Sequence, residues 1–135
     1  MKTHKIPLVL MADDDDDDCT LAKEAFEASL ASGMIHCVED GIKLLKYLSS
    51  SAPLPALILL DLNMPRKDGR QILKELKSTP AFQSIPVVVF TTSRDQKDIT
   101  YSRKMGAKSF ITKPSTFVEW IEIMRSLADT WLVTN

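Results

Sequence analysis

Carboxylates stand at the ends of two apolar segments of the sequence. Asp13 and Asp14 directly follow residues 7–12, and Asp61 directly follows residues 57–60. If both segments are parallel strands of one sheet, their carboxyl ends lie at the same edge and the three acids meet there. Three like charges so close together repel, raise one another's pKa and need a cation. Oxygen ligands of this kind suit Mg²⁺, which keeps part of its water shell and accepts a phosphoryl oxygen well.

A hydroxyl and an ammonium group stand at the ends of two further apolar segments. Thr91 ends residues 86–91, and Lys113 directly follows residues 109–112. Taken singly, Thr91 could be a hydroxyl satisfied by local backbone and Lys113 an ordinary surface lysine. At the same edge as the three carboxylates, however, they could hydrogen-bond and neutralise a phosphoryl group carried by Asp61. The combination predicts a phosphoryl-accepting site.

The run of six aspartates at 13–18 allows two other interpretations. The first is a solvated acidic loop, the simpler explanation of the run when it is taken alone. The second is a calcium-binding EF-hand, whose loop positions one, three, five and twelve would be Asp13, Asp15, Asp17 and Glu24. Against the EF-hand, the sixth position is Asp18, where the sharp turn of the loop needs glycine. The apolar segment before the run also has the character of a strand rather than a helix.

The elements that must position these residues alternate along the chain. Amphipathic stretches with a helical period separate short apolar runs, and the stretch at 95–105 is the weakest of them. The apolar runs have the character of buried strands and cover residues 7–12, 35–38, 57–60, 86–91 and 109–112. The last helical stretch is the most regular, with apolar positions at Phe117, Trp120, Ile121, Met124, Leu127 and Trp131. We expect Phe117 and Ile121 to lie in the core.

Helix starts are marked as well. Thr116 and Glu119 form a capping-box pattern before the last helix. The aspartates at 13–18 lie where a first helix should begin, opposite the positive end of its dipole. Five strands alternating with five helices predict an α/β fold, with a parallel sheet covered on both faces by right-handed crossovers. Such sheets bind ligands outside the carboxyl ends of their strands.

Length and composition narrow the class of protein. The chain has 135 residues, enough for one domain, and it is 44% hydrophobic and 26% charged, as in globular proteins. A formal net charge of −1 gives no general attraction to nucleic acid or to an anionic membrane. No apolar run is long enough to span a bilayer, and the N-terminus does not resemble a secretory signal. We therefore expect a cytoplasmic protein with no direct nucleic-acid or membrane partner.

The cysteines and histidines do not form a metal-binding pattern. Cys19 and Cys37 are the only cysteines, and in a cytoplasmic protein we expect them to be buried, reduced thiols. The two histidines, His4 and His36, are not at ligand spacing to each other or to the cysteines. A zinc site is therefore not expected.

Taken together, these motifs resemble the CheY-like receiver domains of two-component response regulators over essentially the whole chain. The resemblance rests on four motifs in the family's order and spacing: VLMADD (9–14), LLDLNMPRKDG (59–69), VVVFTT (87–92) and FITKP (110–114). It implies a flavodoxin-like (βα)5 fold, with a doubly wound parallel sheet of five strands in the order 2-1-3-4-5. It also implies a single receiver domain over residues 1–135 without an output domain, acting as a phosphoacceptor switch rather than as an enzyme with an external substrate.

The resemblance assigns a role to each residue of the acidic site. Asp61 matches the phosphoacceptor, which receives its phosphoryl group from a sensor histidine kinase. Asp13, Asp14 and the Asn63 main-chain carbonyl match the ligands that hold Mg²⁺ together with Asp61, and Mn²⁺ or Ca²⁺ could replace Mg²⁺. The remaining alternatives are an unphosphorylated pseudo-receiver, against which the intact site argues, and the calcium-binding module described above.

The resemblance also assigns the parts of a conformational switch. Lys113 matches the phosphate-binding lysine and is expected to be joined to Pro114 by a cis peptide bond, which only proline makes inexpensive. Thr91 matches the switch threonine. Phe110 matches the switch aromatic residue and lacks the hydroxyl of the tyrosine often found there. Together these residues would bias the fourth helix and fifth strand toward an active surface.

Within the family, the sequence is particularly similar to standalone receivers that serve bacterial phytochrome kinases. This similarity implies a bacteriophytochrome as a candidate partner kinase, and signalling by docking or dimerisation through the fourth helix, fifth strand and fifth helix. Trp131 and Leu132 are candidates for a dimer or partner contact, or they simply cap the core. The similarity rests on the aspartate-rich opening and on DDCTLAKEAF (17–26), TTSRDQKDI (91–99) and TWLVTN (130–135).

Overall fold

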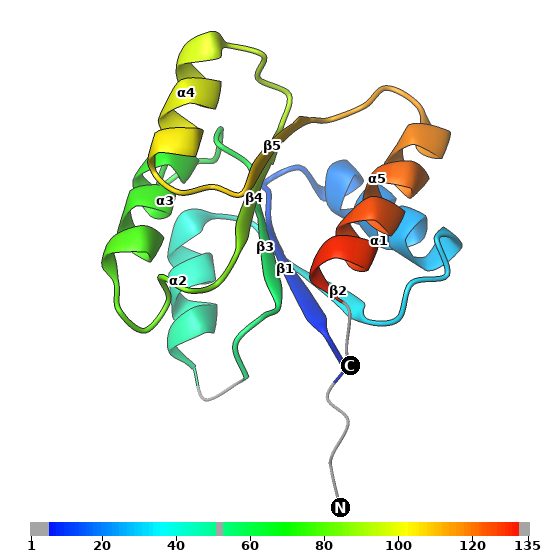
Figure 1. Cartoon of the computed structure of the whole chain (residues 1–135), viewed down its shortest axis with the longest axis horizontal. Helices are drawn as coiled ribbons and strands as arrows, with labels where there is room; N and C mark the ends of the chain where they lie inside the picture. The colour runs from blue at the N-terminus through cyan, green and yellow to red at the C-terminus, as the bar shows by residue number, and fades with distance from the viewer. Residues whose placement is uncertain (1–5, 51–52, 133–135) are drawn as a thin grey trace, which may run out of the picture.

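The chain folds around a five-stranded parallel sheet. The computed structural model describes residues 6–50 and 53–132 (Figure 1). The strand order β2-β1-β3-β4-β5 confirms the predicted doubly wound, flavodoxin-like α/β fold. The strands are β1 (Leu8–Ala12), β2 (Met34–Val38), β3 (Leu57–Leu60), β4 (Val87–Thr91) and β5 (Ser109–Thr112).

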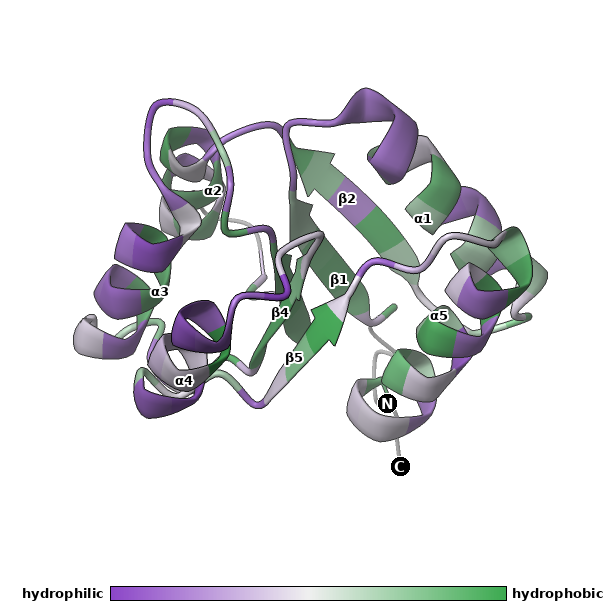
Figure 2. Ribbon diagram, turned by 90° about the horizontal axis from the view of Figure 1, so that it is seen from above, coloured by the Kyte–Doolittle hydropathy of each residue, from purple (hydrophilic) through white to green (hydrophobic). Residues whose placement is uncertain are grey.

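Five helices cover the two faces of the sheet. Helices α1 and α5 lie against one face, and α2, α3 and α4 lie against the other (Figures 1 and 2). Of the helices that the structure describes, none combines the length and apolar character needed to cross a lipid bilayer. The helices are α1 (Asp16–Ala28), α2 (Gly41–Ser49), α3 (Gly69–Ser78), α4 (Gln96–Lys104) and α5 (Phe117–Trp131).

Alternate residues of the central strands build a separate core on each face of the sheet. Because successive side chains of a strand point to opposite faces, a strand that is apolar throughout fills both layers. Phe90 and Trp120 meet edge to face in the layer under α1 and α5, with ring centroids 5.1 Å apart. That layer takes Val9, Met11, Leu57, Leu59, Val88 and Phe90 from the sheet, and the other layer takes Leu10, Ala12, Ile58, Leu60, Val87 and Val89.

Each helix begins at a side-chain oxygen that accepts a hydrogen bond from its first turn, as capping requires. Asp15 caps α1 and accepts from the main-chain N–H groups of Asp17 and Asp18. Thr116 caps α5, and its hydroxyl both accepts from the Glu119 N–H and donates to the Glu119 carboxylate. Both predicted helix starts are therefore confirmed. The remaining caps are Asp40, Asp68 and Asp95.

The early start of α1 rules out the EF-hand interpretation of the acidic run. Asp17 and Glu24, which would be loop ligands, both lie inside α1. A residue in the middle of a continuous helix cannot belong to a twelve-residue loop that wraps around an ion. Only the beginning of the aspartate run remains outside the helix.

One predicted core position of α5 is wrong. Phe117 is 41% exposed, whereas Trp120, Met124 and Leu127 on the same stripe are buried. Phe117 is the first residue of the helix. Because no helical turn precedes it, the buried stripe does not extend as far as its side chain. At the other end Leu132 is buried, which favours the core-capping alternative for this residue.

The loop after β3 passes very close to the residue that ends this strand. Gly69 opens α3, and a Cβ atom added there would lie 2.2 Å from the Asp61 main-chain oxygen and 2.6 Å from the Leu62 Cα atom. The Gly69 N–H donates to the Leu62 carbonyl at 3.0 Å. Any side chain at Gly69 must therefore push against backbone, and this backbone carries Asp61.

We predict that Gly69→Ala lowers the free energy of unfolding by about 1–3 kcal/mol, the usual cost of overpacking a closely packed site. Chemical denaturation followed by circular dichroism measures it. Gln71→Ala, at an exposed position in the first turn of the same helix, is the matched control and should change stability by less than roughly 0.5 kcal/mol. Equal stability of Gly69→Ala and wild type would contradict the close approach.

Candidate functional site

Asp13 and Asp61 are neighbours because β1 and β3 are adjacent parallel strands. Ala12, the last residue of β1, pairs with Leu60, the last residue of β3, so the two aspartates leave the sheet side by side. One carboxylate oxygen from each of Asp13, Asp14 and Asp61 lies within 4.8 Å of the other two. Across residues 6–50 and 53–132, these three make up the one group of His, Cys, Asp or Glu side chains spaced to hold a metal ion.

Asp13 has an oxygen available for a cation. Its Oδ1 atom accepts a hydrogen bond from the Asp15 N–H at 2.9 Å. Its Oδ2 atom is buried and forms a close ion pair with the Lys113 ammonium, at 2.6 Å, and no further donor among the described residues reaches it. Burial raises the pKa of Asp13 to about 6, against the lowering effect of Lys113. A buried carboxylate oxygen whose close partner is a single ammonium group, beside two more carboxylates, fits a divalent cation.

The two carboxylate oxygens of Asp61 face different groups. Oδ1 accepts from the Thr91 hydroxyl at 2.8 Å and from the Asn63 N–H at 3.2 Å. Oδ2 faces Lys113, whose Nζ atom lies 3.5 Å away. Asp61 and Thr91 are both buried. Oδ1 is thus held by two hydrogen bonds, whereas among the described residues Oδ2 has only the longer contact with Lys113.

Lys113 is enclosed by carboxylates. Its side chain is 6% exposed, and its Nζ atom lies 2.6 Å from Asp13 Oδ2, 2.7 Å from Asp18 Oδ2 and 3.5 Å from Asp61 Oδ2. Burial pulls the pKa of Lys113 down, but the close contacts with the Asp13 and Asp18 carboxylates raise it by more, so the net pKa is raised. Lys113 is therefore a permanently charged group at the centre of the site.

Asp18 belongs to this cluster and was missed as a site residue from the sequence. It was grouped with the aspartates that flank the site, without a partner of its own. Helical spacing from the predicted ligands gives no signal for it, because Asp14 precedes the helix and does not share a helical face with Asp18. Choosing it over Asp15, Asp16 or Asp17 required knowing where the helix begins, and α1 begins at Asp16.

The predicted cis peptide bond between Lys113 and Pro114 is wrong: no peptide bond among the described residues is cis. The trans form of an X–Pro bond is favoured by roughly 0.5–1 kcal/mol, so the isomer depends on small differences in local packing. With the bond trans, Lys113 still reaches the acidic site. The Pro114 carbonyl accepts a hydrogen bond from the Trp120 indole at 3.2 Å, which ties this loop to α5.

The other predicted residues are placed as follows. Phe110 is half-buried and packs against the core layer under α2, α3 and α4. Cys19 and Cys37 are both free thiols and half-buried rather than fully buried. Trp131 is half-buried against the other core layer. His4 lies outside the described residues.

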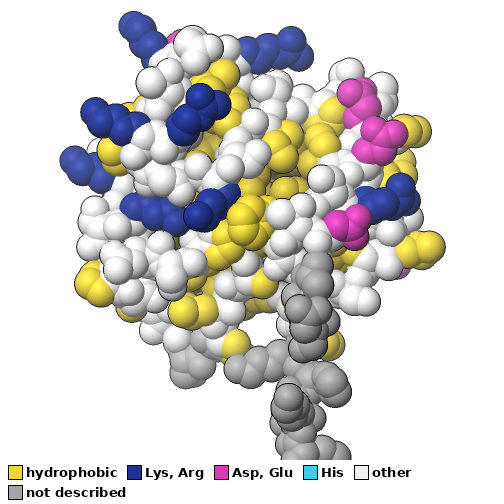
Figure 3. All heavy atoms as spheres, viewed as in Figure 1, with side chains coloured by type: hydrophobic (Ala, Val, Ile, Leu, Met, Phe, Trp, Pro, Cys, Tyr) yellow, Lys and Arg dark blue, Asp and Glu magenta, His cyan; other side chains and the backbone are white. Residues whose placement is uncertain are grey.

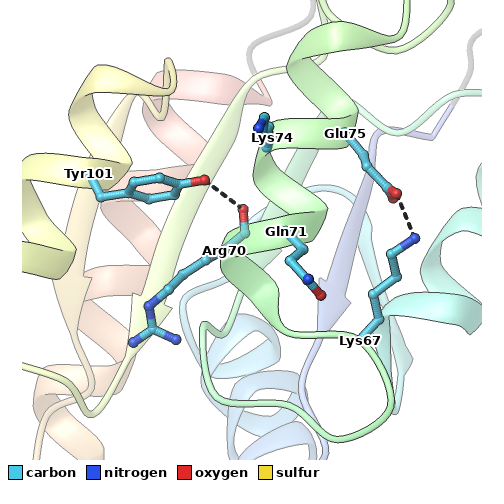
Figure 4. A pocket seen from close by; sticks show the side chains of 6 residues that line it. All are labelled: Lys67, Arg70, Gln71, Lys74, Glu75 and Tyr101. Carbon is cyan, nitrogen blue, oxygen red and sulfur yellow. Dashed lines mark hydrogen bonds and ion pairs between the residues drawn. The ribbon is translucent and has the colours of Figure 1, made fainter.

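A separate hollow lies between α3 and α4 (Figure 4). The Tyr101 hydroxyl donates to the Arg70 main-chain oxygen at 3.3 Å across it, and Lys67 donates to Glu75 at 2.6 Å. These polar groups bind each other, and none of Asp13, Asp14, Asp61, Thr91 or Lys113 lines the hollow. Its lining residues are Lys67, Arg70, Gln71, Lys74, Glu75 and Tyr101.

Comparison with known proteins identifies the family to which this chain is similar. The family model described as response regulator receiver domain matches residues 9–125. Response regulator Rcp1 of Synechocystis sp. is 32% identical over 132 residues, which cover 94% of this chain and 90% of Rcp1. Receiver domains act as phosphoacceptor switches, bind a divalent metal at an acidic pocket and partner with sensor histidine kinases.

Solved structures of high similarity agree with the sequence comparison. The phosphorylated cyanobacterial phytochrome response regulator RcpA superposes with a TM-score of 0.88 at 34% identity, with 97% of each chain covered. The Mn²⁺-bound form of Rcp1 superposes with a TM-score of 0.84 at 31% identity, with 96% of each chain covered. RPA3017, a response regulator in red light signalling of R. palustris, gives 0.86 at 33% identity, again with 96% of each chain covered.

We predict that Asp13→Asn stabilises the metal-free protein at pH 7 by about 1–3 kcal/mol, because the folded state disfavours the charge that Asn removes. The folded pKa of about 6 lies above the ordinary value of 3.8, so wild-type stability falls as the pH rises through that interval. The advantage of Asp13→Asn should therefore vanish near pH 4.

Urea denaturation in the presence of a chelator, at pH 4 and at pH 7, measures this effect. Asp14→Asn is the matched control, because it removes the same charge from an exposed position of the same cluster. We expect a smaller change for Asp14→Asn. A loss of stability for Asp13→Asn at pH 7 would show that the contact with Lys113 outweighs the cost of burial.

Proposed function

The chain belongs to the response regulator receiver domain family, and we propose that it is a cytoplasmic response regulator that accepts a phosphoryl group on Asp61 from a sensor histidine kinase. The observation that carries the proposal is the cluster in which Asp13, Asp14 and Asp61 meet within 4.8 Å while Lys113 and Thr91 contact Asp61. Each of these five groups has a use in phosphoryl transfer, and a module that only binds partners would not need them together.

Asp61 is the nucleophile in this proposal. Its Oδ2 atom attacks the phosphorus of a phosphohistidine, the N–P bond breaks, and the imidazole leaves and takes up a proton from solvent. Thr91 and the Asn63 N–H hold Oδ1 meanwhile, which fixes the direction in which Oδ2 points. Catalysis of this kind is mostly positioning and charge stabilisation.

Asp13, Asp14, Asp61 and the Asn63 main-chain carbonyl would hold Mg²⁺, with Mn²⁺ or Ca²⁺ able to replace it. When bound, the cation offsets negative charge on the phosphoryl oxygens. The fit rests on the buried Asp13 Oδ2 atom, whose close partner is a single ammonium group, and on the two carboxylates beside it. The similarity to Rcp1, which is known in an Mn²⁺-bound form, supports binding of a divalent ion by this chain.

Lys113 and Thr91 would bind the transferred group. The Lys113 ammonium is already 3.5 Å from the reacting oxygen of Asp61, and the Thr91 hydroxyl is a donor within reach of the same carboxylate. Both can donate to phosphoryl oxygens, which are stronger acceptors than the carbonyl oxygen left on an acyl phosphate. Phosphorylation would therefore draw both side chains toward the new group.

Thr91 is connected to α4 by a short series of hydrogen bonds. The Ser93 hydroxyl donates to Asp98 at 2.7 Å, and Asp98 forms a two-point ion pair with Arg70 of α3, at 2.8 and 2.7 Å. The hydrogen bond from Arg70 lowers the pKa of Asp98, which keeps the pair charged. A shift of Thr91 would displace Ser93, two residues along, and so change how α4 is held.

We propose that the resulting signal is read by docking or dimerisation on the face formed by α4, β5 and α5. Lysine and arginine side chains gather over α3 and α4, whereas acidic side chains gather over α1 and α5 (Figure 3). A partner that reaches α4 therefore meets positive charge. Trp131 is half-buried and keeps part of its surface for such a contact, and Phe110 lies between this face and the core.

We further propose a bacteriophytochrome as the partner kinase. RcpA is a phytochrome response regulator and RPA3017 acts in red light signalling, and both match nearly the full length of this chain. Incubation with phosphorylated phytochrome kinases and with unrelated sensor kinases, followed by the rate of phosphate transfer, tests the pairing. Equal rates from all kinases would remove the phytochrome assignment.

Phosphorylation of Asp61 has a direct test. Phosphoramidate or acetyl phosphate with Mg²⁺ should add one phosphoryl group per chain, found by peptide mass spectrometry on Asp61, and a chelator should abolish the labelling. Asp61→Asn should remain unlabelled while it retains the wild-type circular dichroism spectrum. Labelling elsewhere, or none in wild type, would refute the proposed function.

Thr92 is exposed beside the buried switch threonine and is bulkier than the alanine or glycine common at this position of the family. Its methyl and hydroxyl groups stand where a water molecule would approach the phosphoryl group, so they should slow hydrolysis. We predict that Thr92→Ala shortens the phosphoryl lifetime by a factor of roughly two to five, measured by loss of the label after removal of the phosphodonor. An unchanged lifetime would contradict this role.

A further inference from the structure

We propose that Asp18 is a positioning residue that holds Lys113 away from Asp61 and thereby weakens the hold of the site on a phosphoryl group. The inference deepens the proposed function and rests on it. It starts from the observation that Lys113 lies closer to Asp18 than to the residue it is expected to serve. The two distances are 2.7 Å to Asp18 and 3.5 Å to Asp61.

The contact joins distant parts of the chain inside the site. Asp18 lies in the first turn of α1, and Lys113 directly follows β5. The side chain of Lys113 is 6% exposed and that of Asp18 is 19% exposed. An ion pair so shielded from water is stronger than the usual surface pair, which contributes little. The Asp18 carboxylate is thus a real competitor for the ammonium.

Asp18 has no other described side-chain partner that would explain its position. The hydrogen bonds that cap α1 are accepted by Asp15, whose carboxylate receives the N–H groups of Asp17 and Asp18. Asp16 and Asp17 are exposed in the same turn and already supply negative charge at the helix N-terminus. The described interaction of the Asp18 carboxylate is therefore the one with Lys113.

Asp13 cannot take over this task when the site is in use. Its Oδ2 atom, which pairs with Lys113 at 2.6 Å, is also the buried oxygen that fits a cation. Once Asp13 is engaged by a cation, its hold on Lys113 is weakened. Asp18 does not belong to the group of three carboxylates spaced to hold a metal ion, so it still lies at hydrogen-bond distance from the ammonium.

The competition sets how readily Lys113 binds the transferred group. To donate to a phosphoryl oxygen on Asp61, the ammonium must give up or lengthen its contact with Asp18. Removing the charge of Asp18 should therefore release Lys113 toward Asp61 and tighten binding of a phosphoryl group. By the same reasoning, wild-type Asp18 favours return of the switch to its resting state.

Binding of beryllofluoride, a stable phosphoryl mimic, in the presence of Mg²⁺ is the test. Trp120 serves as the reporter, because its indole donates to the Pro114 carbonyl next to Lys113. A Trp131→Phe background leaves Trp120 as the one tryptophan of the chain. In that background we expect Asp18→Asn to bind beryllofluoride roughly three- to tenfold more tightly than the parent, as exchange of one charge-assisted hydrogen bond allows.

Two variants separate the contact from general charge. Asp17→Asn removes the same charge from the neighbouring exposed residue and should leave the affinity within about twofold of the parent. Asp18→Glu keeps a carboxylate that can reach Lys113 and should restore the parent affinity. Circular dichroism melting checks that every variant is folded, and Asp18→Ser repeats the measurement with a different side chain.

A second measurement needs neither cation nor mimic. In the metal-free protein, the ¹⁵N-labelled Lys113 ammonium group should give a slowly exchanging NMR signal, because it is buried among three carboxylates that shield it from water. Asp18→Asn should broaden or shift this signal, whereas Asp17→Asn should leave it unchanged. The comparison reports on the contact itself, independently of any phosphoryl chemistry.

The outcomes are distinct. Tighter binding by Asp18→Asn alone, with recovery in Asp18→Glu, supports the proposal. Unchanged or weaker binding by Asp18→Asn, or equal tightening by Asp17→Asn, overturns it while leaving the proposed function intact. If the parent neither binds beryllofluoride in a Mg²⁺-dependent manner nor accepts phosphate on Asp61, both the proposed function and the role of Asp18 fail.

Discussion

The buried ammonium group of Lys113 allows carboxylates from three parts of the chain to share one edge of the sheet. Asp13, Asp18 and Asp61 all approach it, at 2.6, 2.7 and 3.5 Å. Like charges this close would repel strongly if nothing positive stood between them. One ammonium does not neutralise them, and Asp14 adds a further negative charge at the rim. The remaining negative charge is what gives the site its affinity for a divalent cation, so the structural role of Lys113 and the chemistry of the site have one origin.

Such a site must be held by a scaffold that does not yield to repulsion. The strands that carry Asp13, Asp61 and Thr91 are the three central ones, packed on both faces by apolar side chains. The loops are restricted as well, by the side chains that cap the starts of α1 and α3 and by the close approach of Gly69 to the Asp61 backbone. The pKa of Asp13 is still raised, which shows that Lys113 does not fully offset the cost of burying this carboxylate. The buried charge of Asp13 lowers the stability of the fold, and it lies where a negative charge is needed to bind a cation.

The parts of this arrangement that were predictable from sequence are those that depend on period and strand ends. Apolar runs placed Asp13, Asp61 and Lys113 at one edge, because parallel strands leave no other geometry, and the family motifs then gave the strand order. The direction of the Asp18 side chain depends on where α1 begins, because each residue of error in the helix start rotates the expected direction by about 100°. Phe117 was misplaced for a different reason: the start of α5 was predicted correctly, but Phe117 is its first residue, where the buried stripe has not yet begun. The Lys113–Pro114 bond depends on a difference of less than about 1 kcal/mol, too small for a motif to determine.

The two oxygens of Asp61 explain how chemistry at this edge becomes a change of shape. Oδ1 accepts from Thr91, and Oδ2 faces Lys113. In the proposed reaction Oδ2 forms the bond to phosphorus, and Oδ1 becomes the carbonyl of an acyl phosphate. It then loses its share of the negative charge, and its hydrogen bond from Thr91 weakens. The phosphoryl oxygens meanwhile offer Thr91 a charged acceptor nearby. Formation of the acyl phosphate bond thus weakens the hydrogen bond that holds Thr91 in place. Ser93 and Asp98 connect the movement of Thr91 to α4.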